Sequence, residues 1–382
     1  MRFGLFITPN HRPDDDPTLA LERDLRLVEH IEALGYDEAW FGEHHASGWQ
    51  YIASPETFIA AASQRTTQIR LATGVAGLPF QHPLMLADRI MLLNHLSKGR
   101  VILGTGPGGP QLDAPMMGLD PDCLKDRHGE ALEAIIALLT SDEHINRTTD
   151  WFTIKNGRLQ LRPYRDRPIE VVVSALSSAA GPTLAGRFGL SVLSLGLLAN
   201  GGDKRIKDMW RTAEQSAAEH GNTMDRGGLR LAGPRMHLAP TDAEARRDVA
   251  FGLQKAVEHM YASGARHVSP DDDLDTTIDK LNESGSVIIG TPDRAVAHLE
   301  ELRNTFGDFG CYLIPTQDWA DSAATSRSYE LFARYVIPHG SAQTASLQRA
   351  AAEFNEIVSN KPGPALKLTA GKVRVEDAVV TG

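Results

Sequence analysis

The segment IRLATGVAGLPFQHPLMLADRIMLLNHLSKGRVILG, residues 69–104, contains the clearest structural pattern in the chain. Its short apolar run at Ile69–Gly74 predicts a strand, and the apolar residues at helical spacing in Leu84–Leu96 predict a helix. A second strand is predicted at Val101–Gly104. A helix between two short strands is typical of a parallel β–α–β unit. The fold class therefore depends on whether this unit repeats along the chain.

The same alternation runs through all 382 residues. Strands are predicted at Arg2–Ile7, Glu38–Phe41, Ile69–Gly74, Val101–Gly104, Glu170–Val173, Ser191–Leu195, Arg230–His237 and Cys311–Pro315. Helices are predicted at Thr18–Leu34, Thr57–Ser63, Leu84–Leu96, Asp122–Leu139, Pro182–Arg187, Lys204–His220, Thr241–Tyr261, Pro292–Phe306 and Ser322–Val336. Eight strands that alternate with helices predict an α/β fold, the (β/α)₈ TIM barrel, with an open doubly wound sheet as the alternative.

Two insertions and a C-terminal extension interrupt this pattern. Trp151–Pro163 contains Asn156-Gly157 between alternating residues, which predicts a short hairpin. Ala262–Ser286 is predicted as a long loop, either a mobile lid or a solvated insertion. We expect residues 1–340 to form the barrel and residues 341–382 to form an extension with one helix, packed on the barrel or on a neighbouring subunit.

Composition limits the class of function. The chain is 42% hydrophobic with a formal charge of -10, so it can bury a large core, and nucleic acid or an anionic membrane is not its expected partner. No run of about 18 apolar residues exists, so no membrane-spanning segment is expected. Two cysteines, Cys123 and Cys311, are too few for a disulfide framework and fit a reducing, cytoplasmic setting.

Reactive groups of such barrels lie at the C-terminal ends of the strands. Glu43-His44-His45 directly follows the second predicted strand. His44 can act as a general base or stabilise a developing anion near neutral pH, and Glu43 can orient its ring. A purely structural hydrogen-bonding role fits the sequence equally well.

Small residues follow the third and fourth strands. Thr73-Gly74-Val75-Ala76-Gly77 would let the backbone approach a flat ligand closely, or would simply form a tight turn. The loop Gly104–Pro110, which contains Gly106, is either a flexible active-site loop or a phosphate cradle. Its spacing matches neither a dinucleotide fingerprint nor a P-loop.

Serines follow the fifth strand and open a helix. Ser174, Ser177, Ser178 and Gly181 would place hydroxyl and free N–H groups at a helix N-terminus, where anions bind. The alternative is helix capping by Ser178. No cluster of His, Cys and Asp has metal-ligand spacing, so no metal site is expected.

Together and in this order, these motifs resemble the bacterial-luciferase-like flavin monooxygenases, from Met1 to about Pro338. The motifs similar to the luciferase α-subunit are Gly35-Tyr36-Asp37, Glu43-His44-His45, Leu78-Pro79, His82-Pro83 and Ser97-Lys98-Gly99-Arg100. Two further stretches, Gly106–Pro121 and Ser177–Arg187, look more like the limonene monooxygenase group.

The resemblance implies a flavin site. It implies a non-prolyl cis peptide bond at Gly74-Val75 behind the flavin ring and a catalytic His44 at the ring's reactive edge, assisted by Glu43. The residues that would bind the cofactor are Thr73, Gly74, Val75, Ala76, Gly106, Ser174, Ser177, Ser178 and Gly181, with the FMN phosphate near Ser177, Ser178 and Gly181. Gly106-Pro107 replaces a phosphate-binding Cys-Arg pair of luciferase, so backbone N–H groups or another base such as Arg187 would take that role.

The activity implied is that of a two-component monooxygenase. Reduced FMN would come from a separate NAD(P)H:flavin reductase, and O₂ would be used to oxygenate a small apolar organic substrate. A homodimer formed through helices in the first third of the barrel is expected. Two alternatives stay open: a deazaflavin-dependent oxidoreductase and a non-catalytic flavin-binding protein.

Overall fold

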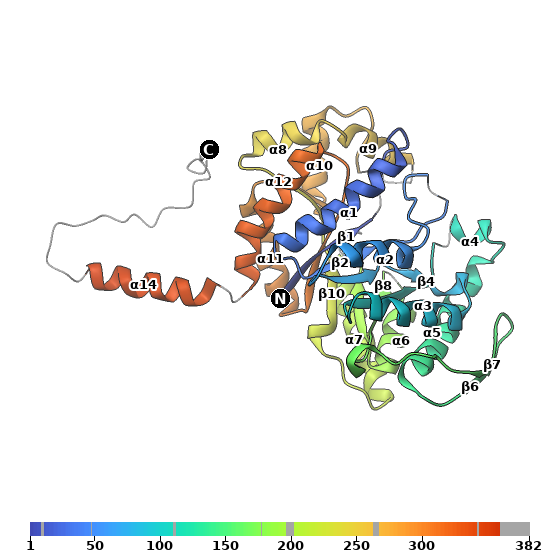
Figure 1. Ribbon diagram of the computed structural model, residues 1–382. Coiled ribbons are helices and arrows are strands. Elements are labelled where there is room, and N and C mark those ends of the chain that lie inside the picture. The colour runs from blue at the N-terminus through green and yellow to red at the C-terminus, as the bar shows by residue number, and fades with distance from the viewer. Residues whose placement is uncertain are drawn as a thin grey trace.

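The computed structural model describes residues 1–8, 11–46, 48–109, 112–176, 178–195, 202–262, 267–341 and 344–359. A parallel sheet of eight long strands runs in the order β3-β2-β1-β13-β10-β9-β8-β5, and β3 also pairs with β5. The sheet therefore closes on itself, and helices surround it (Figure 1). The predicted (β/α)₈ barrel is confirmed, and the open sheet is not found.

All barrel strands except β10 coincide with the predicted ones to within two residues at each end, and the strand predicted at Arg230–His237 extends beyond β10. The barrel strands are β1 (Arg2–Ile7), β2 (Glu38–Phe41), β3 (Arg70–Thr73), β5 (Val101–Gly106), β8 (Glu170–Ala175), β9 (Ser191–Ser194), β10 (Leu229–Ala232) and β13 (Cys311–Pro315). The surrounding helices are α1 (Pro17–Ala33), α2 (Pro55–Arg65), α3 (Pro83–Leu96), α5 (Leu124–Thr140), α6 (Ala180–Phe188), α7 (Gly202–Glu219), α11 (Pro292–Phe306) and α12 (Ser322–Leu331).

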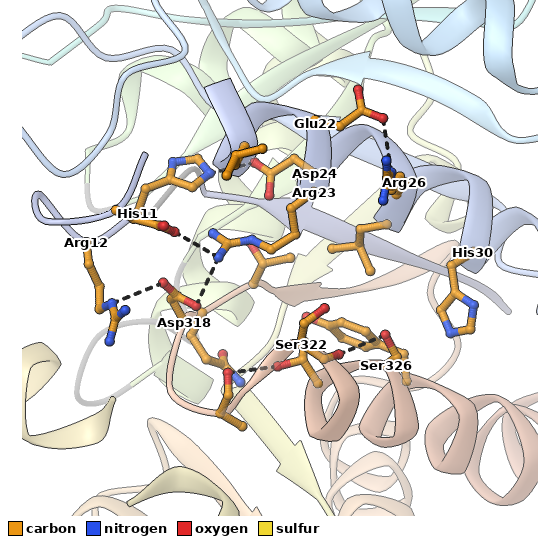
Figure 2. A pocket seen from close by; sticks show the side chains of 18 of the residues that line it. His11, Arg12, Glu22, Arg23, Asp24, Arg26, His30, Asp318, Ser322 and Ser326 are labelled. Atoms are coloured by element: carbon orange, nitrogen blue, oxygen red, sulfur yellow. Dashed lines mark hydrogen bonds and ion pairs between the residues drawn. The ribbon is translucent and has the colours of Figure 1, made fainter. Parts of the chain in front are cut away.

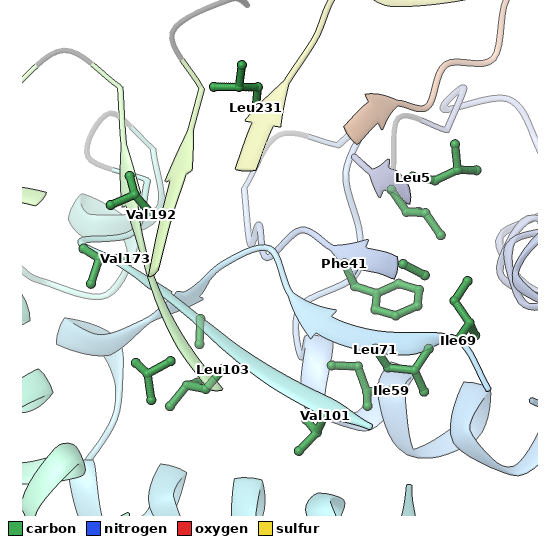
Figure 3. Close-up of a cluster of buried hydrophobic side chains, with 14 of the residues drawn as sticks. Leu5, Phe41, Ile59, Ile69, Leu71, Val101, Leu103, Val173, Val192 and Leu231 are labelled. Atoms are coloured by element: carbon green, nitrogen blue, oxygen red, sulfur yellow. The ribbon is translucent and has the colours of Figure 1, made fainter. Parts of the chain in front are cut away.

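Alternation along each strand builds two apolar layers. Side chains such as Leu5, Leu71 and Leu103 point outward and pack against the helices (Figure 3). Their neighbours along the strands point inward and fill the barrel: Phe6, Trp40, Ala72, Ile102, Val172, Leu193, Ala232, Cys311 and Leu313. Because each fully buried Leu, Ile or Val contributes about 1.5–3 kcal/mol, these two layers supply the main stabilisation of the fold.

The N-terminal end of the barrel is closed by buried charges. Arg230 on β10 donates to both carboxylate oxygens of Glu38, at 2.8 and 3.0 Å, and both side chains are fully buried. Arg230 also pairs with Glu170 at 2.8 Å, and Arg70 pairs with Glu170 at 2.7 Å. Burial alone would raise the pKa of Glu38, but the attraction of Arg230 outweighs it and holds that pKa below its usual value. This end serves stability, opposite to the end where chemistry occurs.

A small lobe is inserted between β10 and α11. It consists of β11 (Arg235–Leu238), β12 (Val287–Gly290), α8 (Asp242–Val249), α9 (Leu253–Ala262) and α10 (Leu274–Glu283). β11 and β12 pair with each other in parallel, outside the barrel sheet. The lobe has a hydrophobic cluster of its own, which includes Val249, Leu253, Ile278 and Trp319.

Three predictions for this part of the chain are wrong. The strand predicted at Arg230–His237 is two strands, because the chain turns at Gly233. Only glycine fits at this turn, since a Cβ there would lie 2.1 Å from the Tyr312 hydroxyl. The helix predicted at Thr241–Tyr261 breaks at Gly252, whose N–H donates to the Trp319 carbonyl at 2.8 Å. The loop predicted at Ala262–Ser286 contains α10, which the Asp273 side chain caps; residues 263–266 lie outside the described ranges.

The predicted hairpin exists but is shifted. Its antiparallel strands are β6 (Ile145–Thr148) and β7 (Thr153–Gly157), and the Thr149 N–H donates to the Phe152 carbonyl across the turn. Asn156-Gly157 ends β7 and does not form the turn. Polar side chains of this turn satisfy its backbone, since the Thr149 hydroxyl accepts from the N–H groups of Trp151 and Phe152.

The chain leaves the barrel at its N-terminal end. After α12, a turn of π-helix (Phe332–Val336) and the short α13 (Ile337–Gly340) bring Gly340 against Phe3. The predicted C-terminal helix is α14 (Ala345–Ser359), and residues 360–382 lie outside the described ranges.

Candidate active site

The predicted site residues lie at the C-terminal ends of neighbouring strands. Glu43-His44-His45 follows β2, the short strand β4 (Ala76–Gly77) follows β3, and β4 pairs with Thr105-Gly106 of β5. Ser174 lies on β8, next to β5 in the sheet. One rim of the barrel therefore carries the histidines, the small residues and the serines.

His44 is held by a carboxylate, but not by the predicted one. Its Nδ1 lies 3.1 Å from Oδ2 of Asp113, on the short helix α4 (Asp113–Met116). The other oxygen of Asp113 accepts the backbone N–H of His45 at 3.0 Å. Asp113 is buried, whereas the His44 side chain is 40% exposed. Asp113 thus fixes the ring and leaves Nε2 of His44 for exchange of a proton.

Glu43 has a different task. One oxygen lies 3.1 Å from Nε2 of His45, and the other accepts the N–H of Gly77 at 3.1 Å. The hydrogen bond to Glu43 raises the pKa of His45. Glu43 therefore links the loop after β2 to β4. The prediction that Glu43 orients the ring of His44 is wrong, because the carboxylate that contacts this ring belongs to Asp113.

The Gly74-Val75 peptide bond is cis, as the resemblance implied. It follows β3, where the Gly74 N–H donates to the Phe41 carbonyl and the Thr73 hydroxyl donates to the Gly104 carbonyl. A Cβ built on Gly74 would lie 3.0 Å from the ring of Phe6, so the backbone rests directly on side chains that fill the barrel.

Gly106 joins the two sides of the site. A Cβ built on it would lie 2.6 Å from Cγ2 of Val75 and 2.8 Å from Oγ of Ser174. No real Cβ fits at these distances, so only glycine lets the three residues meet. Gly106 is itself buried, so its backbone packs directly between Val75 and Ser174, which are both partly exposed.

The N-terminus of α6 is open. Its N-cap is Ala179, which makes no side-chain hydrogen bond, and no acidic residue lies in the first turn. Ser178 is exposed, so it does not cap the helix as the alternative interpretation required. Gly181 brings the first turn against the Ser174 carbonyl, where a Cβ would lie 2.3 Å away. Ser177 lies outside the described residues.

Arg187 does not reach this end of α6. It lies in the last turn of the helix, 3.6 Å from Glu133, with its guanidinium over the Phe188 ring. Any anion at the start of α6 would therefore be bound by backbone N–H groups and serine hydroxyls.

Two buried residues of the site were missed in the sequence. Asp113 follows the glycine-rich loop, and nothing local links it to His44, 69 residues away. His128 on α5 is buried, and its Nε2 lies 3.2 Å from the Thr105 hydroxyl, which donates to the Val172 carbonyl at 3.3 Å. Burial lowers the pKa of His128 to about 4, so it is neutral when it supports β5 beside Gly106.

Residues 1–308 match the model of the family described as luciferase-like monooxygenase. The chain belongs to this family.

Two relatives of the luciferase-like family are similar over most of their length. Limonene 1,2-monooxygenase of Rhodococcus erythropolis is 40% identical over 368 residues, which cover 93% of each chain. The 4-hydroxyprotoasukamycin monooxygenase of Streptomyces nodosus subsp. asukaensis is 41% identical over 340 residues, 88% of this chain and 91% of that one. Such similarity places the chain among monooxygenases, which are oxidoreductases.

A solved structure carries a flavin on the same fold. The oxygenating constituent of 3,6-diketocamphane monooxygenase from Pseudomonas putida, a type II Baeyer–Villiger enzyme in complex with FMN, has a TM-score of 0.71 and 25% identity. The match covers 88% of this chain and 98% of that chain. A flavin is therefore the cofactor that the luciferase-like family membership supports. Within the described ranges, no helix is long and apolar enough to cross a bilayer.

Replacing Gly106 with Ala should lower the affinity for flavin about tenfold or more. The new Cβ must displace Val75 or Ser174, which we expect to contact the ligand, and a loss of about 1.4 kcal/mol from these contacts corresponds to tenfold. Quenching of FMN fluorescence on titration would measure the affinity. Gly129→Ala is the matched control, because a Cβ there would lie 3.5 Å from Leu184, an ordinary contact. Equal affinities in the two variants would contradict this geometry.

Proposed function

We propose that the chain is the oxygenase component of a two-component monooxygenase that uses FMN reduced by a separate NAD(P)H:flavin reductase. The substrate is a small apolar organic molecule, and O₂ is the co-substrate. The observation that carries the proposal is the convergence of His44, the cis Gly74-Val75 bond and the open N-terminus of α6 on one barrel rim.

The residues at this rim fit a flavin mononucleotide. Because Gly106 has no side chain, Val75 and Ser174 stand close together at the rim, and both are partly exposed there, so they can contact a flat ring. The uncapped first turn of α6, with Ser178 exposed beside it, suits a phosphate. We assign the ring to Thr73, Gly74, Val75, Ala76 and Gly106, and the phosphate to Ser174, Ser177, Ser178 and Gly181. When bound, reduced FMN would supply the two electrons with which O₂ is activated.

His44 would accept a proton during the reaction and donate it back. Because Nδ1 faces the Asp113 carboxylate, Nε2 carries the lone pair that accepts a proton and returns it. Asp113 acts through His44 and is a positioning residue. Glu43 keeps the loop after β2 joined to β4, so the ring of His44 stays at the edge of the small-residue surface.

Names of relatives indicate the substrate class. One relative is named for limonene, a hydrocarbon, and a structural neighbour is named for a diketocamphane. A small, mostly apolar cyclic molecule is therefore the first substrate to test. The cytoplasm, where NAD(P)H is available to a reductase, is the compartment that we propose.

An anaerobic titration with FMN, reduced FMN and oxidised deazaflavin tests the proposal. We expect reduced FMN to bind, and O₂ uptake with a substrate to require NAD(P)H and an added flavin reductase. Preferential binding of deazaflavin would favour an oxidoreductase that works without O₂. Tight FMN binding without turnover of any substrate would favour a non-catalytic flavin-binding protein.

We also propose a homodimer through α2 and α3. The outward face of α3 exposes Met85, Leu92 and Leu96 by 55%, 52% and 44%. Contiguous exposed apolar residues of this kind mark protein interfaces. Leu92→Glu should convert the dimer to a monomer in sedimentation at micromolar concentration, whereas Leu161→Glu, at a residue 44% exposed elsewhere, should not. A monomeric unsubstituted chain would refute the dimer.

A further inference from the structure

The carboxylate that holds His44 comes from a part of the chain with little regular structure of its own. Asp113 begins α4, a helix of only four residues, shortly after the glycine-rich loop that follows β5. The Ala114 N–H donates to the Gly109 carbonyl at 3.1 Å, and a Cβ built on Gly109 would lie 2.3 Å from Oδ2 of Asp113. The carboxylate therefore lies against the backbone of the loop, and the course of the loop decides where Asp113 is held.

A second histidine and carboxylate pair shows the contrast. Nε2 of His11, in the loop after β1, lies 2.9 Å from Oδ2 of Asp24 (Figure 2). Asp24 is in the middle of α1, a helix of 17 residues, so backbone hydrogen bonds on both sides fix its position. A single helical turn such as α4 is not stable on its own. Asp113 therefore depends on contacts from outside its helix.

The ring of Phe80 makes such a contact with the loop. Phe80 ends the 3₁₀ turn Leu78–Phe80, directly after β4. Gly108 has a φ of 84°, which favours glycine, and a Cβ built on it would lie 2.3 Å from Cε2 and Cζ of Phe80. A Cβ built on Gly77 would lie 2.6 Å from Cδ2 of the same ring. The ring therefore packs directly on the backbone of β4 and on that of the glycine-rich loop.

Phe80 also meets the histidine next to His44. The ring centroids of Phe80 and His45 lie 6.0 Å apart at an interplanar angle of 86°, a favourable edge-to-face arrangement. The His45 N–H donates to Oδ1 of Asp113 at 3.0 Å, while Oδ2 lies 3.1 Å from Nδ1 of His44. Phe80 thus touches both the loop that leads to Asp113 and the residue whose amide Asp113 accepts.

We propose that Phe80 is a positioning residue, whose ring sets the course of the glycine-rich loop and so places the Asp113 carboxylate on His44. The effect of Phe80 on catalysis rests on the proposed function, whereas the placement of Asp113 does not. The two are therefore measured separately.

Hydrogen exchange resolved to single residues, in the chain without flavin, tests the placement. In Phe80→Ala the amides of His45 and Ala114 should both exchange about tenfold faster, because the loop and Asp113 are held less firmly. Gly108→Ala, which forces a Cβ into the ring, should have the same effect. Phe188→Ala is the matched control, because Phe188 is also half-buried but lies at the C-terminal end of α6.

Three results of the exchange experiment would overturn the proposal. The first is unchanged exchange in Phe80→Ala. The second is equally faster exchange in Phe188→Ala, which would indicate general destabilisation. The third is a change at His45 without one at Ala114, which would show that the ring supports His45 and not the loop.

Product yield separates positioning from direct contact with a ligand. Phe80→Ala should lower the yield of oxygenated product about tenfold, and in an Asp113→Asn background it should have little further effect, because residues that act as a unit are not additive. A further tenfold loss in that background would mean that Phe80 contacts flavin or substrate, and would overturn the positioning role. If the unsubstituted chain forms no product while the amides respond as expected, the proposed function fails and the placement of Asp113 stands.

Discussion

Replacing His44 with Ala should lower the yield of oxygenated product about 10²-fold or more, while the chain folds as before. A positioned general base contributes about 10²–10⁴-fold to a rate, and the Asp113 carboxylate lies at Nδ1, on the side of the ring away from Nε2. Since the His44 side chain is 40% exposed, its removal leaves no large cavity. The measurement is product formed per reduced FMN oxidised, with circular dichroism to check folding.

Substitution of Asp113 tests whether this residue acts through His44. Asp113→Asn should lower the yield about tenfold or more, because the amide cannot hold the ring nitrogen as the carboxylate does. In the His44→Ala background the same change should have little further effect, since residues that act as a unit are not additive. An unchanged yield for His44→Ala would remove this histidine from the mechanism.

Replacing Arg230 with Met should destabilise the barrel by about 3 kcal/mol or more without touching the active site. The variant leaves Glu38 buried without its main partner, and breaking a buried ion pair costs about 3–5 kcal/mol. We expect a value near the lower limit because Arg2 stays 2.8 Å from Glu38. Urea denaturation followed by circular dichroism would measure the change in midpoint.

A surface arginine and a second substitution control this experiment. Arg211→Met on α7 removes an exposed ion pair with Asp208, so the free energy of unfolding should change by no more than about 0.5 kcal/mol. Adding Glu38→Gln to Arg230→Met should recover part of the loss, because the unpaired charge is removed. If both arginine variants unfolded at the same urea concentration, the buried ion cluster would have no structural importance.

The barrel was predictable because each strand is a short apolar run with a helix behind it. The strand at Val101–Gly106, for instance, is bounded by Arg100 and a proline-containing loop. The inserted lobe was not predictable in the same way. Asp273 caps a helix, yet in sequence it belongs to a run of acidic residues that is equally typical of a loop. Such ambiguity is settled only by the apolar partners of Ile278, which come from other parts of the lobe.

In the site, the sequence identified residues that chemistry requires but not the residues that hold them. His44 and the small residues around Val75 stand out because they follow strands. The contact between Gly106, Val75 and Ser174 depends on the pairing of β4 and β8 with β5, which the barrel imposes. The carboxylate of Asp113 reaches His44 only through the path of the glycine-rich loop. Local sequence carries no signal for such a contact.

A crystal structure of the chain with bound FMN would show which end of the barrel holds the flavin. We predict that the flavin ring lies against the cis Gly74-Val75 bond with one edge toward His44, and that the phosphate lies at the first turn of α6 near Ser178. A flavin bound away from this rim would contradict the assignment of the rim as the active site.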